Sequence, residues 1–440
     1  MKKFFYLALA AAAMASCSSD ESITSPEVTA EAASDAVSFG VYTQTTRSGI
    51  ETTGTIKNNG FGVFAFSQMT EPIAFYSKQN YLPNFMYNQQ VAFNTTSSEW
   101  EYAPVKYWPN NPGALVSYYA YGPYFPEFNE DLYTFTPESN DYSNEYETIP
   151  NKNVRLILGY DAYGPAIEYT RSSDALQGVD LLWGADKKLV DAGTSPLTSP
   201  VDCPKPNVDD KIYFYFKHAM SRLHFNIQVW PDEAPTTKPD ATPGSSATEA
   251  QKGLADGTTI VIKKVELIGN LWNKGTLRLY DGQWKHDKGD FSNLVFEGDD
   301  FSDAVKAGIT GTVAAKEIDL LKGGPSLVDG VVKDDSQIDN FVMVMPGSEF
   351  AIQITYDVIT KDPANPKNTS VVTNVIKSTD PNAATKPDGF PHNGGKYSIE
   401  QGKAYNFHLN IGMTSVKFDA TVKDWDIETG EIGLPDNTNP

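Results

Sequence analysis

Apolar and polar residues alternate over many short stretches of this chain, a pattern typical of β-strands with one buried face. The first stretch places Val37, Phe39 and Val41 in alternation with Ser38 and Gly40. Three similar alternations follow, over residues 223–229, 405–411 and 416–422. Each of these segments is predicted to be a strand that turns one face towards a core.

Other stretches are rich in apolar residues and are also predicted to be strands. The strongest are residues 61–66, 114–121 and 212–216, and the last of them is fully apolar. Further strands are expected over 100–108, 179–184, 260–268, 276–280, 341–345 and 350–358. Residues 361–396 are predicted to be a polar insertion. No stretch carries a sustained helical face, and Gly, Pro, Asn and Asp interrupt the pattern at short intervals.

Many short strands arranged in two blocks predict an all-β fold, with two tandem antiparallel β-sandwich domains. The chain has 440 residues, which is too long for one core. The Pro-rich stretch 199–206 is the best linker by composition. We therefore expect an N-terminal domain over 48–210 and a C-terminal domain with a C-terminal tail over 211–440.

The start of the chain has the features of a secretory signal. A short basic segment precedes the apolar run Phe4–Ala13, and small residues end at Cys17. The run is too short to span a bilayer, which needs about 20 residues. We expect residues 1–16 to be a lipoprotein signal peptide, because a Cys directly after small residues resembles a bacterial lipobox. An ordinary signal peptide with an incidental Cys is the alternative.

Acylation of Cys17 would make it the first residue of the mature protein and hold it in a membrane, since each buried CH₂ contributes about 0.8 kcal/mol. Residues 17–35 are rich in Ser, Thr, Ala and Glu, a composition typical of a tether. The strand after this tether leads to Arg47, Ser48 and Gly49, an open sequence for an Arg-specific protease. The alternative is a surface Arg that follows an edge strand.

Composition narrows the function further. The formal net charge is −21, which argues against nucleic acid or an anionic membrane surface as a partner. If Cys17 carries lipid, Cys203 is left alone and no intrachain disulfide can form. None of the five histidines pairs with another at metal-ligand spacing, except that His218 and His224 flank the start of one strand. These two are expected to be strand-end residues, so no cofactor or metal is predicted.

An enzyme is not expected. The chain has no Gly-rich phosphate loop, no Gly-x-Ser-x-Gly and no His-Glu-x-x-His. Acidic residues over 297–303, including Asp299 and Asp300, offer no ordered pattern for acid–base chemistry or Ca²⁺. Cys203 is expected to be an inert thiol. The aromatic region 81–133 could stack on sugars, although β-sandwiches use such residues in their cores.

Several motifs together resemble the fimbrillin family of Bacteroides-type surface pili. They occur in one order along nearly the whole chain: Gly62–Phe66, Tyr107–Pro109, Ser117–Pro123, Asp180–Gly184, Phe216–Phe225, Gly402–Tyr405, Ser415–Phe418 and Val422–Trp425. Residues 18–21 also resemble the acidic, serine-containing export tag of surface lipoproteins in this group, with a plain polar tether as the alternative.

The resemblance implies two transthyretin-like β-sandwich domains and export as an outer membrane lipoprotein exposed at the cell surface. It implies cleavage after Arg47, so that a new chain begins at Ser48, and loss of a first strand that carries Val37, Phe39 and Val41. A neighbouring subunit would fill the vacated groove by donor strand exchange. Within residues 416–440, the candidate donor strand carries Val416, Phe418, Ala420 and Val422.

The physics of this scheme does not depend on the family. Removing a strand from a sandwich exposes backbone hydrogen-bonding groups and an apolar groove, which a strand of another chain can fill. Head-to-tail repetition gives an open filament. The expected function is therefore a fimbrial subunit, as a stalk, tip or accessory pilin. The alternatives are a lipid-retaining anchor and a surface lipoprotein that does not polymerise and binds glycans or host ligands.

Overall fold

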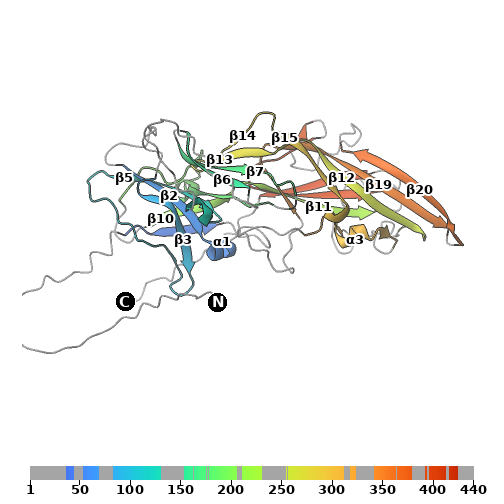
Figure 1. The fold of residues 1–440 in the computed structure, drawn as a ribbon, viewed down its shortest axis with the longest axis horizontal. Helices are drawn as coiled ribbons and strands as arrows, with labels where there is room; N and C mark the ends of the chain where they lie inside the picture. Colours follow the sequence, from blue (N-terminus) through green and yellow to red (C-terminus); the bar gives the residue numbers. More distant parts are fainter. Residues whose placement is uncertain are drawn as a thin grey trace, which may run out of the picture.

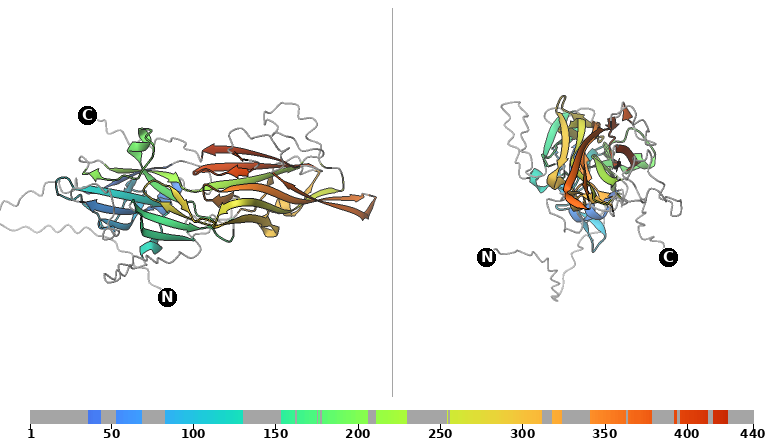
Figure 2. Two further views of the ribbon diagram at one scale, coloured as in Figure 1. Left: turned by 90° about the horizontal axis from the view of Figure 1, so that it is seen from above. Right: turned by 90° about the vertical axis from the view of Figure 1, so that its right-hand side faces the viewer.

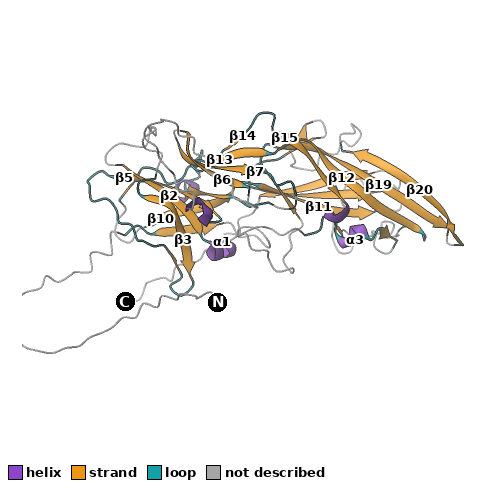
Figure 3. Ribbon diagram, viewed as in Figure 1, coloured by secondary structure: helices purple, strands orange, loops and turns teal. Residues whose placement is uncertain are grey.

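The computed structural model describes residues 36–43, 53–68, 83–129, 153–161, 163–174, 176, 178–205, 211–229, 254, 256–311, 318–323, 341–362, 364–378, 392–393, 396–412 and 416–424. These residues form an elongated molecule with an N-terminal half and a C-terminal half along its long axis (Figures 1 and 2). Strands make up both halves, with a few short helices at their margins (Figure 3). The all-β prediction is confirmed.

Two sheets build the N-terminal half. The larger has the order β2-β3-β4-β1-β10-β8-β5-β9 and an additional β2–β5 pairing. Its strands are β1 (Phe39–Thr43), β2 (Phe61–Gln68), β3 (Met86–Asn94), β4 (Glu99–Glu101), β5 (Leu115–Gly122), β8 (Leu182–Asp186), β9 (Cys203–Pro204) and β10 (Ile212–His218). The second sheet contains β14 (Trp284–His286), β13 (Lys274–Arg278), β7 (Gly164–Thr170) and β6 (Val154–Asp161) in that order.

The β2–β5 pairing closes the larger sheet into a ring of seven strands, β2, β3, β4, β1, β10, β8 and β5. Alternate residues of β2 and β5 serve two cores. Val63 and Tyr118 pack with the side chains that the ring encloses. Phe64 and Tyr119 belong to a second cluster, which includes residues of β6, β7 and β13. Both faces of β2 and β5 are therefore buried, which explains why their sequences are largely apolar.

The C-terminal half is a sandwich of two further sheets around one large core. One sheet has the order β15-β12-β19-β22-β21, with β16 on β12 and β20 on β19. Its strands are β12 (Thr258–Trp272), β15 (Phe291–Glu297), β16 (Ile309–Thr310), β19 (Glu349–Asp362), β20 (Asn365–Lys377), β21 (His392–Asn393) and β22 (Lys396–Ser398). The other has the order β17-β11-β23-β24, with β18 on β11, from β11 (Ser221–Val229), β17 (Ile318–Asp319), β18 (Phe341–Val344), β23 (Lys403–Ile411) and β24 (Val416–Asp424).

Short helical segments complete the fold. They are α1 (Thr53–Asn59), α2 (Lys187–Asp191), α3 (Asp303–Lys306) and two 3₁₀ turns, Pro126–Asn129 and Gly298–Asp300. Side chains cap α2 and α3: Asp186 accepts a hydrogen bond from the backbone of Lys188 at the start of α2, and Ser302 accepts one from Val305 in α3. Among the described strands, pairings are antiparallel except for β1–β10 and β11–β23, which are parallel.

Strands pass directly between the halves. β10 and β11 are separated by only Ala219 and Met220, and β12 and β13 by Asn273. β10 belongs to the N-terminal ring although it begins after residue 210, and β13 pairs with β7 although it begins at residue 274. The expected boundary between residues 210 and 211 therefore does not coincide with the division of the sheets.

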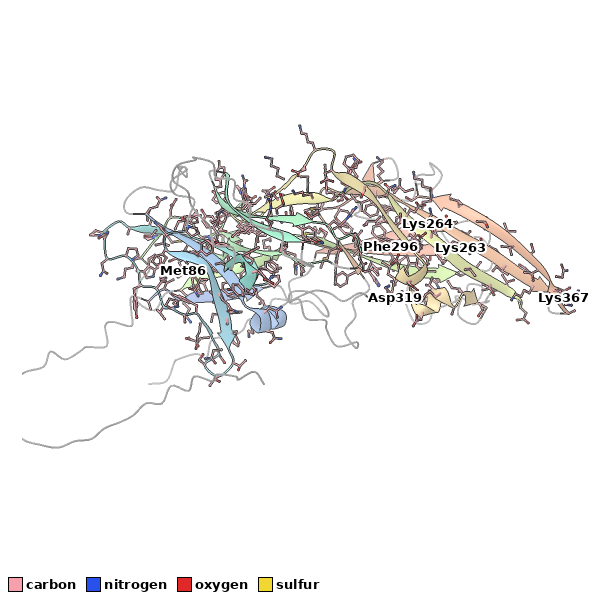
Figure 4. All side chains as sticks on the ribbon, viewed as in Figure 1. Met86, Lys263, Lys264, Phe296, Asp319 and Lys367 are labelled. Carbon is pink, nitrogen blue, oxygen red and sulfur yellow. The ribbon has the colours of Figure 1, made fainter. Side chains whose placement is uncertain are left out.

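The polar insertion expected over residues 361–396 is wrong in part, because β20 is a strand of 13 residues. It pairs with β19 in a hairpin that extends to the far end of the molecule, where Lys367 lies opposite the half that holds Met86 (Figure 4). Val371, Val372 and Val375 are more than half exposed. An exposed strand lacks the buried face that makes the apolar pattern readable.

Candidate functional site

β1 is one of the strands of the ring sheet and lies between β4 and β10. It pairs in parallel with β10 over five positions, from Phe39 opposite Ile212 to Thr43 opposite Phe216. On its other side Phe39 lies opposite Trp100 of β4, and the amide of Val37 donates to the carbonyl oxygen of Lys106 at 2.8 Å. β1 thus satisfies backbone groups on both neighbours and completes the ring.

Phe39 is the centre of the contact between β1 and the core. It is 1 % exposed and lies 5.4–6.4 Å, between ring centroids, from four aromatic rings: Phe61, Tyr102, Tyr118 and Phe214. Val37 is also buried and Val41 is half-buried against the same cluster. Burying one such side chain contributes about 1.5–3 kcal/mol. The side chains of residues 37–41 thus stabilise the core, although most of the cluster comes from other strands.

Gly40 is required by the ring of Tyr213, which lies over it. The two residues are directly opposite each other in the β1–β10 register. A Cβ atom at residue 40 would lie 2.3 Å from Cδ1 and Cε1 of Tyr213. An aromatic side chain that covers a glycine on the neighbouring strand is a recurrent way to stabilise such a pair. Gly62 and Tyr121 repeat the arrangement between β2 and β5.

Polar contacts tie the flanks of β1 together. The hydroxyl of Tyr102 donates to the carbonyl oxygen of Val37 at 2.8 Å, and burial raises the pKa of Tyr102 to about 12. Lys211, just before β10, lies 3.1 Å from the carboxylate of Glu99 in β4. This ion pair joins the two strands on either side of β1.

β1 and β23 lie one after the other along the same edge of β10–β11. The amide of Ile212 donates to Ser38, while the carbonyl oxygen of Met220 accepts from the amide of Gly402, just before β23. Between them, the amide of Ala219 donates to Leu181 on the opposite side. Backbone groups of alternate residues point to the same edge of a strand. The even-numbered residues of β10–β11 therefore form backbone hydrogen bonds first with β1 and then, further along the chain, with β23.

The candidate donor strand lies at an edge of the C-terminal half. β24 pairs with β23 over nine positions, from Val416 opposite Ile411 to Asp424 opposite Lys403. The register sets the four candidate positions opposite four buried residues of β23, in the order Val416–Ile411, Phe418–Leu409, Ala420–Phe407 and Val422–Tyr405. The predicted strand is present, and within the described residues it is paired with its own chain.

Three site residues of the sequence analysis, Cys17, Arg47 and Ser48, lie outside the described residues. Arg47 follows the last residue of β1 by four positions. The structure thus brings the predicted first strand into the ring, whereas the lipid site and the cleavage site remain predictions from the sequence.

The residues considered for chemistry have structural partners. His218 is buried with its Nδ1 2.9 Å from Asp180, and His224 contacts Asn406 and Asp319. Asp300 accepts a hydrogen bond from the amide of Glu297 and caps a 3₁₀ turn. Within the described ranges no group of His, Cys, Asp and Glu could hold a metal ion.

Cys203 and the aromatic region 81–133 also pack against the protein. Burial raises the pKa of the Cys203 thiol to about 12, so it is not activated as a nucleophile. Trp108, Tyr118, Tyr119 and Tyr121 are buried, whereas Tyr107 is 57 % exposed. No helix in the described part of the chain has the length and apolar character to cross a membrane.

Sequence reasoning missed the residues on neighbouring segments that contact β1. The apolar run of β10 was visible, but nothing local indicated that it would receive β1 in parallel. Tyr102 and Tyr213 were two among 23 tyrosines. A glycine between two large apolar residues in a strand, as at Gly40, is the one signal that could have indicated a covering aromatic ring.

Comparison with known proteins gives concordant results. Fim1C, a fimbrium subunit from Phocaeicola vulgatus, is 24 % identical over 400 residues, which cover 88 % of this chain and 87 % of the relative. The crystal structure of a fimbrial protein from Bacteroides vulgatus has a TM-score of 0.55 at 18 % identity, covering 89 % of this chain and 99 % of that one, and so shares its fold. Residues 45–425 match the family described as fimbrillin-like, and the chain therefore belongs to the fimbrillin-like family.

Proposed function

We propose that this protein is a subunit of a surface fimbria that is exported as an outer membrane lipoprotein acylated at Cys17. Cleavage after Arg47 then releases the lipidated segment together with β1. A strand from a second copy, or from another subunit of the same fimbria, enters the groove between β4 and β10. Repetition of this step gives an open head-to-tail filament.

The position of β1 in both sequence and structure carries this proposal. In the sequence, β1 lies between Cys17 and Arg47, so one cut after Arg47 separates both the lipid site and β1 from the rest of the chain. In the structure, β1 fills the place between β4 and β10. A single cleavage therefore couples release from the membrane to the opening of a binding groove.

The opened groove has the chemistry of a strand-binding site. Loss of residues 37–43 removes the carbonyl oxygen of Ser38 from the amide of Ile212 and the amide of Val37 from the carbonyl oxygen of Lys106. It also uncovers the core face around Phe61 and Phe214, on which Phe39 packs. Backbone pairing supplies affinity for an extended segment, and the apolar face selects its side chains.

Substitution of Arg47 tests the proposal in cells. Material sheared from cells of the wild type should begin at Ser48 and form polymers. Arg47→Ala should remain as acylated, monomeric precursor in the membrane. Arg47→Lys is the matched control: it should also resist an Arg-specific protease, but added trypsin, which accepts Lys, should release polymer-forming protein from it.

N-terminal sequencing and intact mass distinguish the outcomes. If Arg47→Ala still formed normal polymers, Arg47 would be eliminated as the processing site. Wild-type surface material that keeps acylated Cys17 throughout would identify an anchor or a lipoprotein that does not polymerise.

A further inference from the structure

One sheet of the C-terminal half has two edge strands that expose apolar side chains. Among the described residues, β15 pairs only with β12 and β20 pairs only with β19, so the two strands lie at opposite edges of this sheet. An edge strand offers unpaired backbone groups to a strand of another chain. In the part of this half that the structure describes, the exposed large apolar side chains all belong to these two strands: Phe291, Val295, Val371, Val372 and Val375.

The two edges carry apolar residues on the same face of the sheet. The level of Val295 continues across β12 and β19 to Lys377 of β20 through directly opposite residues. Opposite residues share a face, and faces alternate along a strand. The odd-numbered residues of both strands therefore lie on the outer face, because Leu294 and Phe296 belong to the core. On this outer face, each strand has two exposed apolar residues four positions apart: Phe291 and Val295 on β15, and Val371 and Val375 on β20.

One antiparallel register matches the two edges residue by residue. If Val295 lies opposite Val371, the equal spacing also sets Phe291 opposite Val375. Apolar side chains then meet apolar side chains, and an amide meets a hydroxyl, which are pairs that stabilise a sheet. The register gives the outer-face pairs Val295–Val371, Asn293–Thr373 and Phe291–Val375, and the inner-face pair Leu294–Val372.

Charges at the ends of the two strands favour the same register. β20 has no charged residue between Lys367 and Lys377, and Glu297 is the only charged residue of β15. The register brings the acidic turn Gly298–Asp300, which follows β15, beside Lys367, and it brings Asp290, which precedes β15, near Lys377. Two copies of β20 paired with each other over these residues would instead set Lys367 opposite Lys377, which is unfavourable.

A cleft gives access to the edge of β15. Its volume is about 680 Å³, and it is lined by Ser292–Val295 on one side and by residues 171–174 on the other, with Asp300 between them. Because consecutive side chains point to opposite faces, a cleft lined by four consecutive residues follows the edge of the strand. Arg171 forms part of the opposite wall and donates to the hydroxyl of Ser292 at 2.6 Å.

We propose that β15 of one copy of this chain and β20 of a second copy pair in this register and join two sheets edge to edge. The two edges of one chain are complementary but are separated by β12 and β19, and Phe296 of β15 lies far from Lys367 of β20 (Figure 4). Only different copies can therefore bring these edges together. The contact requires neither the loss of β1 nor cleavage after Arg47, so it is distinct from the head-to-tail assembly of the proposed function.

The strand directions allow the contact to repeat. Neighbouring strands from β15 through β12 and β19 to β20 are antiparallel, so β15 and β20 of one copy run in opposite directions. An antiparallel contact therefore leaves both copies pointing the same way, and each keeps one edge for a further copy. Val295 lies level with Lys377 of its own copy but meets Val371 of the next, so neighbouring copies are displaced by about six residues, or about 20 Å, along the strands. In a fimbria, this contact would join parallel fibres side by side.

Cysteine pairs test the register. Purified full-length chains that carry Cys203→Ser and either Val295→Cys or Val371→Cys are mixed and treated with a mild oxidant. A disulfide-linked dimer is expected, because Cβ atoms of opposite residues in a sheet lie about 4.5–5.5 Å apart. Val295→Cys with Val375→Cys is the matched control: Val375 has the same face and a similar exposure but is four residues out of register, so dimers should be about tenfold fewer. Phe291→Cys with Val375→Cys should link, which shows that position 375 can react.

The outcomes separate a specific contact from aggregation. Equal linking in and out of register would show unspecific association and would overturn the inference. Absence of linking in both matched pairs would also overturn it. Because the chains are not cleaved, neither result depends on processing at Arg47, and the proposed function is tested separately.

Charge reversal tests the orientation of the two strands. Lys367→Glu should reduce the yield of the Val295–Val371 dimer severalfold at low salt, and Asp299→Lys in the partner copy should restore it. Lys396→Glu changes an exposed lysine of β22 in the same sheet, away from both edges, and should leave the yield unchanged. A loss that is equal for Lys367→Glu and Lys396→Glu, or no recovery with Asp299→Lys, would overturn the antiparallel arrangement.

Discussion

Two strands lie along one edge of β10–β11, and they are held in different ways. β23 pairs with β11 over eight positions and with β24 over nine, and it buries Tyr405, Phe407, Leu409 and Ile411. β1 pairs with β10 over five positions and touches β4 at one. Along this edge, β23 is therefore paired extensively on both sides, whereas β1 makes fewer backbone pairings.

This difference bears on the proposed loss of β1. The C-terminal core would lose four alternate side chains with β23, whereas the ring loses mainly Val37 and Phe39 with β1. The pairing of β2 with β5 remains and continues to join the two ends of the opened sheet. Removal of β1 leaves a gap between two ordered strands.

Phe407→Ala should have the largest effect. Phe407 is fully buried and its ring lies 5.0–5.8 Å, between centroids, from Tyr397, Phe225 and Phe350. The substitution should reduce the free energy of unfolding by about 3–5 kcal/mol, in both intact and cleaved protein. Urea denaturation of the two forms measures it. A loss under about 1 kcal/mol in either form would contradict the view that β23 is essential to its sheet.

Phe39→Ala should have a comparable or smaller effect in the intact protein. The cavity it creates should reduce the free energy of unfolding by about 3 kcal/mol, as measured by the same urea denaturation. Val41→Ala is the control, with a smaller loss expected because Val41 is only half-buried. A loss from Phe39→Ala that is no larger than the loss from Val41→Ala would refute the view that Phe39 is the main contact of β1 with the core.

Lys211→Ala should have the smallest effect on stability, and it should speed the release of the segment that bears β1. The pair of Lys211 with Glu99 is largely exposed, so its loss should reduce stability by less than about 1 kcal/mol, and added salt should remove the difference. In cleaved protein, the segment bearing β1 should leave faster in low salt, as followed by chromatography. Lys187→Ala, which breaks an exposed pair with Asp191, should leave the release rate unchanged. Equal acceleration of release in both variants would show that the Lys211–Glu99 pair does not hold the β1 segment in place.

The strands of this protein could be predicted where burial leaves a clear pattern. Stretches rich in apolar residues indicated β2, β5 and β10, and alternation indicated β1, β23 and β24, because each pattern reflects which faces are covered. β20 was missed because its exposed face carries no such pattern. The motifs of the fimbrillin family were likewise readable along most of the chain, and the family is confirmed.

The assembly of these strands could not be predicted from local sequence. The register that sets Gly40 opposite Tyr213 joins positions 173 residues apart, and the passage of β13 back to β7 depends on contacts between distant segments. The hydrogen bond from Tyr102 to Val37 depends on the irregular stretch after β4. Such features arise from tertiary packing, so no window of the sequence contains them.

The β10–β11 strand has a mechanical consequence. Because Ala219 and Met220 are the only residues between its two parts, one covalent backbone runs from the groove into the C-terminal sandwich. In a filament joined through this groove, a pull along the fibre would load the hydrogen bonds between β10 and the inserted strand in shear, so that they share the force. The same backbone would then pass the load to β23, which pairs with β11, and through β23 to β24.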